Sequence, residues 1–300
     1  MKHTLKVTVM LILLFFLSQV VGLAITNQYI DHEKTAETGV TTWEELPYEF
    51  ERPPLEESSS FIYIIIAVLL GTGLLMLLIK FKKVSWWKFW FFISVVVFLT
   101  IALNPFMKQE IALIISFVLA LFKVVRPNIF VHNITEVFIY GGFAAIFVPI
   151  MNLYAVFMLL LLISIYDIYA VWKSKHMVKL AKFQISSRAF AGLSIPYELL
   201  EKENKKKTGR IVKIENKMPK KEEIKTAILG GGDIAFPLIF AGVVMKNTGF
   251  LTSLIIPIFV SITLLILLVK SKEDKFYPAM PFLSLGCLAG YGFILLLNFL

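Results

Sequence analysis

The sequence predicts an all-α, polytopic membrane protein of about nine transmembrane helices, and two observations support this fold class. Of its 300 residues, 58% are hydrophobic and only 17% are charged, whereas roughly a quarter of the residues in a soluble domain are charged. The hydrophobic residues also form blocks long enough to cross a bilayer, which requires about 20 residues per helix. The composition therefore excludes a soluble globular domain.

Nine apolar blocks mark the expected spans. They are Val7–Ile25, Phe61–Ile79, Trp86–Leu103, Ile111–Val125, Ile129–Ile150, Asn152–Trp172, Ile224–Met245, Phe250–Val269 and Met280–Leu300. The fourth block is short and ends at Lys123, so eight spans are an alternative. The first block follows Lys2 and Lys6 and is either a retained helix or a cleaved signal peptide. Its length favours a retained helix, because the apolar region of a signal peptide is usually shorter.

The distribution of Lys and Arg predicts the orientation. With a cytoplasmic N-terminus and nine spans, the cytoplasmic segments hold 26 of the 30 Lys and Arg residues. The external segments hold the others, which are Lys34, Arg52, Lys108 and Lys246. Basic residues accumulate in cytoplasmic loops, so we expect a multi-pass cell-membrane protein with an external C-terminus. The net charge of +9 is attributed to these loops rather than to nucleic-acid binding. The distribution of basic residues also favours nine spans, because with eight spans every later loop would lie on the opposite side of the membrane.

These spans divide the chain into five segments. Residues 1–25 form the first transmembrane helix or a signal-anchor, 26–60 an acidic external loop, 61–172 spans two to six, 173–225 a basic cytoplasmic loop, and 226–300 spans seven to nine. The external loop has nine acidic residues against two basic ones and is expected to be a solvated linker. In the cytoplasmic loop, Arg210–Ile214 alternates in the manner of a strand. We expect it either to add to a substrate as a strand or to form a solvated hairpin.

Ionisable residues inside the expected spans are costly at membrane depth, which makes each a candidate functional residue. Two of them, His132 and Glu136, lie four residues apart near the cytoplasmic end of the fifth span. Side chains at this depth can extend to the membrane interface. We therefore expect a structural role for both.

The other two ionisable residues are Asp167 and Asp233. Asp167 precedes Lys173 by six residues and Asp233 follows Lys225 by eight. At about 1.5 Å per helical residue, both carboxyls lie roughly 9–12 Å from the same membrane edge. Two acids at matched depth on successive spans indicate one site, although each could instead hydrogen-bond to a neighbouring helix.

Paired carboxyls suit peptide hydrolysis without a metal. One carboxyl activates water as a base while the other protonates the carbonyl oxygen, and two acids that share a proton supply both functions. No His/Cys cluster has metal-ligand spacing, and Cys287 lacks a nearby base, so we expect no metal or cofactor. An ion- or proton-coupled transporter or channel is the alternative, although no inverted-repeat partner of the glycine-rich segment is evident.

Two segments beside these acids are predicted to depart from regular helix. Gly230, Gly231 and Gly232 precede Asp233, and Pro237 follows it, which makes a poor helix. Irregular backbone at membrane depth is tolerated where it lines a water-filled cavity or is buried in protein; close helix packing through small residues is the alternative. The run Tyr277–Phe282, which contains two prolines, is expected to form a rigid non-helical element at the same end.

Three short motifs together resemble those of a known family. Tyr166-Asp167, Gly230-Gly231-Gly232-Asp233 and Pro278-Ala279-Met280-Pro281 are similar to the Y-D, G-x-G-D and P-A-L motifs of presenilin and signal peptide peptidase, which are intramembrane aspartyl proteases. Met280 stands where leucine is usual, which is a volume-conserving change. The resemblance covers the sixth span to the C-terminus and the nine-span layout, and the chain looks most like the prokaryotic, archaeal presenilin homologues.

The resemblance implies specific roles and partners. Asp167 and Asp233 would be catalytic, in a water-accessible cavity between spans six, seven and nine. Substrate binding or shaping of the site would fall to Tyr166, Gly230, Gly232, Pro278, Ala279, Met280 and Pro281. The predicted orientation matches presenilin, so the expected substrates are single-span membrane proteins with an external N-terminus, cleaved within the lipid bilayer. No obligate protein partner is evident.

Overall fold

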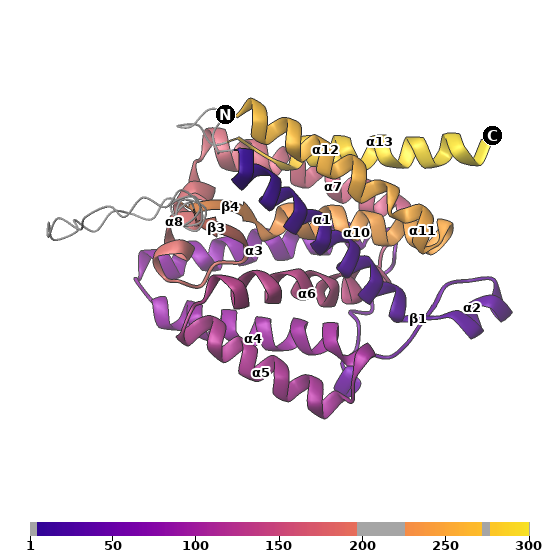
Figure 1. The fold of residues 1–300 in the computed structure, drawn as a ribbon, viewed down its shortest axis with the longest axis horizontal. Coiled ribbons are helices and arrows are strands. Elements are labelled where there is room, and N and C mark those ends of the chain that lie inside the picture. The colour runs from indigo at the N-terminus through magenta and orange to yellow at the C-terminus, as the bar shows by residue number, and fades with distance from the viewer. Residues whose placement is uncertain (1–4, 197–225, 272–276, 300) are drawn as a thin grey trace, which may run out of the picture.

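The computed structural model describes residues 5–196, 226–271 and 277–299, which form a bundle of long helices with two small β-sheets (Figure 1). Within these ranges, seven helical segments are long and apolar enough to cross a membrane. They are α1 (Leu5–Gln28), α3 (Ser60–Lys80), α4 with a short 3-10 turn (Val84–Phe106), α6 (Ile129–Phe147), α7 with a π-helical turn (Leu153–Lys173), α11 and α12 together (Phe250–Lys270), and α13 (Met280–Phe299).

Two further helices lie in the bundle at the positions of the predicted fourth and seventh spans. α5 (Gln109–Val125) has 17 residues and packs against α4 and α6. α10 (Gly231–Thr248) is less apolar because its first turn contains three polar or small residues, ending with Asp233. α10 packs against α1, α6, α7, α12 and α13, so it lies at the centre of the molecule.

The centre of the bundle is densely packed around α10. Most of the α10 side chains are buried, as expected of a helix that is apolar on every side. α1 approaches α10 closely at Gly22, where a Cβ atom would lie 2.4 Å from Leu238. The Gln19 side-chain amide donates a 2.8 Å hydrogen bond to the carbonyl oxygen of Ile234, directly after Asp233. The first apolar block is therefore an integral part of the core.

Two strands lead into the central helix. β3 (Gly192–Pro196) pairs antiparallel with β4 (Thr226–Gly230), with Leu193 opposite Leu229 and Ile195 opposite Ala227. The sequence predicts helix from Ile224, but the helix begins at Gly231. The reason is that the residues before Gly231 pair with β3 instead. The segment Gly231–Pro237, for which the sequence predicts irregular backbone, lies within the helix. β3 follows α8 (His176–Ser186) within the predicted cytoplasmic loop; the predicted strand Arg210–Ile214 lies outside the described residues.

The acidic loop between the first two spans differs from the solvated linker that its composition predicts. It contains β1 (Ile30–Asp31), α2 (His32–Thr38), β2 (Thr42–Trp43) and a 3-10 turn (Pro47–Glu49), and β1 pairs with β2. The Tyr29 hydroxyl donates to the carbonyl oxygen of Ile101 at 2.7 Å, and the Arg52 side chain donates to that of Ala145 at 3.1 Å. A few aromatic and Arg side chains therefore anchor an otherwise charged segment, which composition alone does not reveal.

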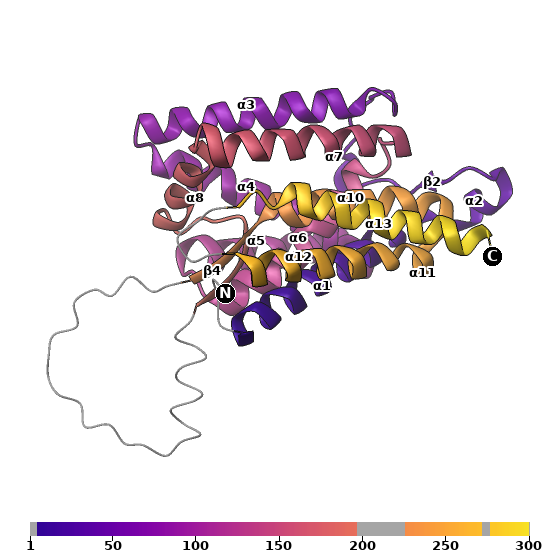
Figure 2. The same ribbon diagram turned by 90° about the horizontal axis from the view of Figure 1, so that it is seen from above.

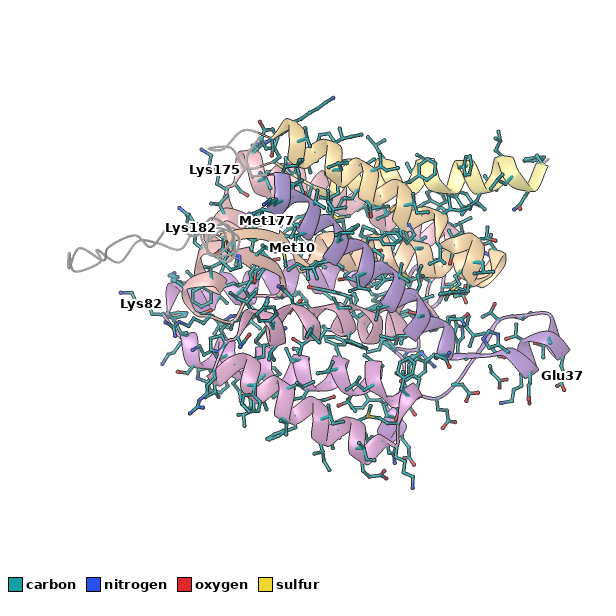
Figure 3. All side chains as sticks on the ribbon, viewed as in Figure 1. Met10, Glu37, Lys82, Lys175, Met177 and Lys182 are labelled. Carbon is teal, nitrogen blue, oxygen red and sulfur yellow. The ribbon has the colours of Figure 1, made fainter. Side chains whose placement is uncertain are left out.

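Several charged side chains mark the two ends of the bundle. Figure 3 places Lys82, Lys175 and Lys182 at one end of the molecule and Glu37 at the opposite end. At the edge of the bundle, α3 packs on α7 (Figure 2) and buries only Ser60 and Ile64. Its remaining apolar surface suits contact with lipid.

Candidate active site

Asp167 lies in the last turn of α7 and is almost completely buried, with 3% of its surface exposed. Its Oδ2 atom accepts a 3.0 Å hydrogen bond from the backbone N–H of Met280, and the N–H of Ala279 also donates to the carboxyl. Its Oδ1 atom has no hydrogen-bond partner among the described residues. One face of the carboxyl is thus held by protein, and the other can bind a reacting group.

The proline-flanked segment supplies these donors because of where the last helix begins. α13 starts at Met280, and the first N–H groups of a helix have no partner within that helix. Pro278 and Pro281 flank the two residues whose N–H groups contact Asp167. A helix N-terminus also carries partial positive charge, so this position favours a carboxylate.

Asp233 lies in the first turn of α10 and is 9% exposed. The N–H of Gly230 donates to its carboxyl, and a Cβ atom at Gly230 would lie 3.3 Å from Asp233 Oδ2. The carboxyls of Asp167 and Asp233 are close enough for their charges to interact, and α7 contacts α10. The fold therefore brings together the two acids that the sequence places at matched depth.

The glycines before Asp233 have different surroundings. A Cβ atom at Gly231 would lie 2.8 Å from the hydroxyl oxygen of Tyr140, so a larger residue there would have to displace the Tyr140 side chain. At Gly232 a Cβ atom would meet only Phe236, at 3.5 Å. The sequence singles out Gly230 and Gly232, whereas the tightest contact is at Gly231. The run of three glycines in the sequence indicates a close contact, but the sequence does not identify Tyr140 as the residue that makes it.

Tyr166 points away from the two aspartates. Its hydroxyl donates to Thr72 Oγ1 at 3.1 Å and lies 3.0 Å from His176 Nε2. It therefore joins α7 to α3 and to α8. Partial burial of His176, which lies outside the spans, lowers its pKa below the usual value.

A cavity of about 470 Å³ opens beside the glycine-rich segment. Its lining includes Gly230, Gly231 and Gly232, aromatic residues of α4, and Met177 and Leu180 of α8. Glu136 and Tyr140 of α6 also line it. Its walls thus come from α4, α6, α8 and the start of α10, so of the predicted spans six, seven and nine only the seventh lines it.

The structural role expected of His132 and Glu136 stays a prediction, but the position of Glu136 differs from the expected one at the membrane interface. Glu136 is 1% exposed and forms an ion pair with Lys123, which is itself 2% exposed. The sequence interprets Lys123 as the cytoplasmic end of the fourth span, but the buried acid on α6 keeps this lysine inside the protein. His132 Nε2 lies 2.8 Å from the carbonyl oxygen of Gly192 in β3.

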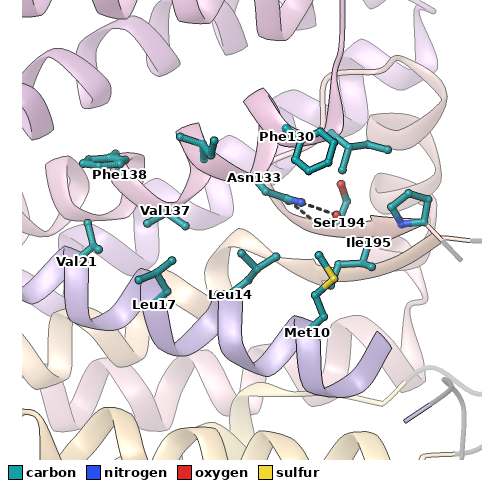
Figure 4. A pocket seen from close by; sticks show the side chains of 13 residues that line it. Met10, Leu14, Leu17, Val21, Phe130, Asn133, Val137, Phe138, Ser194 and Ile195 are labelled. Carbon is teal, nitrogen blue, oxygen red and sulfur yellow. Dashed lines mark hydrogen bonds between the residues drawn. The ribbon is translucent and has the colours of Figure 1, made fainter. Parts of the chain in front are cut away.

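A second, larger cavity lies elsewhere on the molecule. It has a volume of about 770 Å³ and is bounded by α1, α6 and the end of β3 (Figure 4). Its lining is apolar apart from Asn133 and Ser194, which hydrogen-bond to each other. Neither aspartate is among the residues that line either cavity.

Comparisons with known proteins find solved structures of similar fold. Two crystal structures of a presenilin family intramembrane aspartate protease, in the P2 and C222 space groups, have a similar fold. The first has a TM-score of 0.58 and 17% sequence identity over 96% of each chain. The second has a TM-score of 0.56 and 16% identity over 95% of this chain and 99% of the other. No curated protein matches the sequence significantly.

The family comparison covers nearly the whole chain. Residues 13–299 match the family described as signal-peptide peptidase, presenilin aspartyl protease. This range spans the positions of the three short motifs and of both buried aspartates. The chain therefore belongs to the signal-peptide peptidase and presenilin family of aspartyl proteases.

Proposed function

We propose that Asp167 and Asp233 form the catalytic dyad with which this intramembrane aspartyl protease hydrolyses transmembrane segments of other membrane proteins. Family membership gives the enzyme class. The observation that carries the residue assignment is the pair of buried, interacting carboxyls on α7 and α10. The transporter alternative has no support from the family.

The surroundings of the dyad suit water activation. Asp167 Oδ2 is held by the Met280 N–H, while Oδ1 is buried without a protein partner. A buried acceptor is normally satisfied, so Oδ1 is suited to bind the attacking water or the shared proton. The deprotonated carboxyl takes a proton from water as the water oxygen attacks the scissile carbonyl carbon. The protonated carboxyl gives its proton to the carbonyl oxygen, and either residue can begin in either state.

The cavity beside Gly230–Gly232 is suited to hold the substrate. It adjoins the backbone that leads directly to Asp233, and its apolar walls suit a transmembrane segment. Gly232 faces this space without close contacts, so an unwound substrate backbone could approach the dyad there. Pro278 and Pro281 flank the start of α13, whose first backbone N–H groups hold Asp167.

An unwound substrate needs partners for its backbone N–H and C=O groups, and β4 is suited to supply them. The outward edge of β3 is already occupied, because Asn133 hydrogen-bonds to both the N–H and the C=O of Ser194. In an antiparallel pair, alternate residues point their backbone groups away from the partner strand. Ile228, opposite Ser194, therefore points its groups away from β3. Strand addition at this edge would give hydrogen-bond partners to the substrate backbone, whatever the substrate side chains are.

The charge distribution supports nine spans with a cytoplasmic N-terminus. α5 and α10 would be the fourth and seventh spans, because both lie within the helical bundle. Cytoplasmic loops then receive most of the basic residues. The active site lies toward that side, and the substrates are single-span proteins with an external N-terminus. The orientation could be tested by placing single cysteines in the loops and labelling them with an impermeant thiol reagent, in intact and in permeabilised cells.

The decisive experiment reconstitutes the purified protein in lipid vesicles with a tagged single-span substrate. Cleavage without any other protein, absent in the Asp233→Asn variant, is the expected result. Ion flux that depends on the aspartates, with no cleavage of any substrate, would instead favour a transporter. A hydroxyl-containing mimic of the tetrahedral intermediate should inhibit cleavage, and a metal chelator should not.

A further inference from the structure

A buried polar network joins three helices and a strand close to the proposed dyad. Lys123 of α5 pairs with Glu136 of α6 at 2.5 Å and donates to Thr135 Oγ1 at 2.9 Å. The Lys123 ammonium also lies 5.8 Å from the ring centre of Phe91 in α4. Both ionised side chains are at most 2% exposed. A buried ion pair contributes little net stability, so its presence calls for another explanation.

Glu136 uses its second oxygen to hold two groups near the site. Glu136 Oε2 accepts hydrogen bonds from the Tyr140 hydroxyl and, at 2.9 Å, from the backbone N–H of Gly192. Lys123 occupies the other oxygen. The carboxylate thereby has a fixed orientation, because each oxygen has a separate set of donors.

The Gly192 contact positions the strand that leads to Asp233. Gly192 has a φ of +140°, and a Cβ atom there would lie 2.1 Å from the carbonyl oxygen of Leu229 in β4. Next to it, the carbonyl oxygen of Ala191 accepts a 3.1 Å hydrogen bond from the N–H of Gly231. Holding the N–H of Gly192 therefore sets both the pairing of β3 with β4 and the position of Gly231.

The Tyr140 contact reaches the same glycine from the other side. The Tyr140 hydroxyl oxygen would lie 2.8 Å from a Cβ atom at Gly231, so it packs directly on that backbone. Tyr140 is also close enough to Asp233 for the two groups to interact electrostatically. Gly231 is thus held between Ala191 and Tyr140, two residues before the proposed catalytic acid.

We propose that the Lys123–Glu136 ion pair and Tyr140 are positioning residues, which hold Gly231 and so set the place of the Asp233 carboxyl relative to Asp167. This inference rests on the proposed dyad and adds residues that the three motifs do not contain. Lys123 orients Glu136, Glu136 holds Gly192 and the Tyr140 hydroxyl, and both of these contacts converge on Gly231. An apolar replacement of the pair could fill the same volume but could not hold the two donors.

The first test removes only the Tyr140 hydroxyl. The Tyr140→Phe variant, purified and reconstituted with the same tagged substrate, should have kcat reduced by about tenfold or more, because misplacement of a reacting group is costly. KM should remain within about twofold, because the cavity walls that bind substrate persist. Affinity for the hydroxyl-containing inhibitor should fall in parallel with kcat. The control is Tyr63→Phe, on the exposed face of α3, which should match the wild type.

The second test separates positioning from folding. Removing one member of a buried pair destabilises strongly, so both are changed together. Lys123→Met with Glu136→Leu should still fold, with a moderately lower Tm because the Gly192 N–H and the Tyr140 hydroxyl lose their acceptor. It should have reduced kcat and weaker inhibitor binding per folded molecule. A second double variant, Lys123→Met with Glu136→Gln, retains an acceptor for the Gly192 N–H or the Tyr140 hydroxyl. Its kcat should lie between those of the Lys123→Met/Glu136→Leu protein and the wild type.

The outcomes distinguish this inference from the proposed dyad. If Asp233→Asn is inactive while the Tyr140→Phe and Lys123→Met/Glu136→Leu proteins keep wild-type kcat and inhibitor affinity, the positioning role is wrong and the dyad stands. Lower activity with unchanged inhibitor affinity and a smaller folded fraction would also overturn it, because a structural role alone explains that result. Cleavage by Asp233→Asn would overturn the dyad itself.

Discussion

The backbone N–H of Met280 donates a 3.0 Å hydrogen bond to Oδ2 of Asp167, across 113 positions of sequence. This contact gives the proline-flanked motif a direct physical role, because it fixes one of the two acids from the start of the last helix. Replacing Met280 with proline removes the N–H, while proline at the first helical position is otherwise well tolerated. We expect Met280→Pro to lower kcat by at least about tenfold.

The matched control for this change is Met280→Leu, which keeps the N–H and the approximate side-chain volume. It should cleave at close to the wild-type rate when both variants are assayed in the same vesicles. Equal activity of the proline and leucine variants would show that the hydrogen bond to Asp167 is dispensable.

Each aspartate should be indispensable on its own. Asp167→Asn and Asp233→Asn keep the size of the side chain but cannot exchange a proton, and one carboxyl cannot act as acid and base together. We expect both variants to fold and to show no cleavage above background. Thermal unfolding in detergent verifies folding, and near-normal turnover by either purified variant would rule out the two-acid mechanism.

Tyr166 and Gly232 should respond differently to substitution. Tyr166 bonds to Thr72 and His176 rather than to the dyad, so Tyr166→Phe should keep measurable activity. Gly232 lines the cavity beside Asp233, so Gly232→Leu should fill space needed by the substrate and abolish cleavage. Its control is Gly71→Leu on α3, where a Cβ atom would meet nothing within 4 Å. Full activity of Gly232→Leu would show that close backbone approach is unnecessary there.

The proposed substrate strand can be tested at Ile228. The N–H of Ile228 points away from β3, so Ile228→Pro removes a donor for a substrate without removing a β3–β4 hydrogen bond. KM should rise or cleavage should be lost, whereas Ile228→Val should behave as wild type. Cleavage by a folded Ile228→Pro protein with unchanged kcat and KM would exclude strand addition at this edge.

His176 should make stability depend on pH. Because burial lowers the pKa of His176 in the folded protein, the unfolded chain binds its proton more readily. This contribution to stability is therefore complete above the ordinary His pKa of about 6.5 and decreases as the pH falls below it. Between pH 7.5 and 5.5, the Tm of the wild type should fall more than that of His176→Gln. Parallel Tm profiles of the two proteins would contradict this role for the imidazole.

How far the sequence predicts this protein depends on whether the relevant signal is local. Apolar blocks and the sidedness of charge are local, because a span must cross a fixed thickness of hydrocarbon. They predicted a multi-pass helical protein. The Tyr-Asp, Gly-rich and Pro-flanked motifs are also local and led to the family. The family match over residues 13–299 confirms that prediction, while the catalytic roles of Asp167 and Asp233 stay predictions.

What only the tertiary structure decided concerns pairs of groups far apart in the chain. The sequence interprets Lys123 as the end of a span and Glu136 as an interfacial side chain, since each considered alone costs too much to bury. Burial becomes acceptable only because each is the other's partner, on different helices. The same holds for Tyr140 against Gly231, for β3 against β4, and for the Met280 N–H on Asp167. Composition and spacing give the cost of burying each group, but the partner that offsets this cost is identified only by the fold.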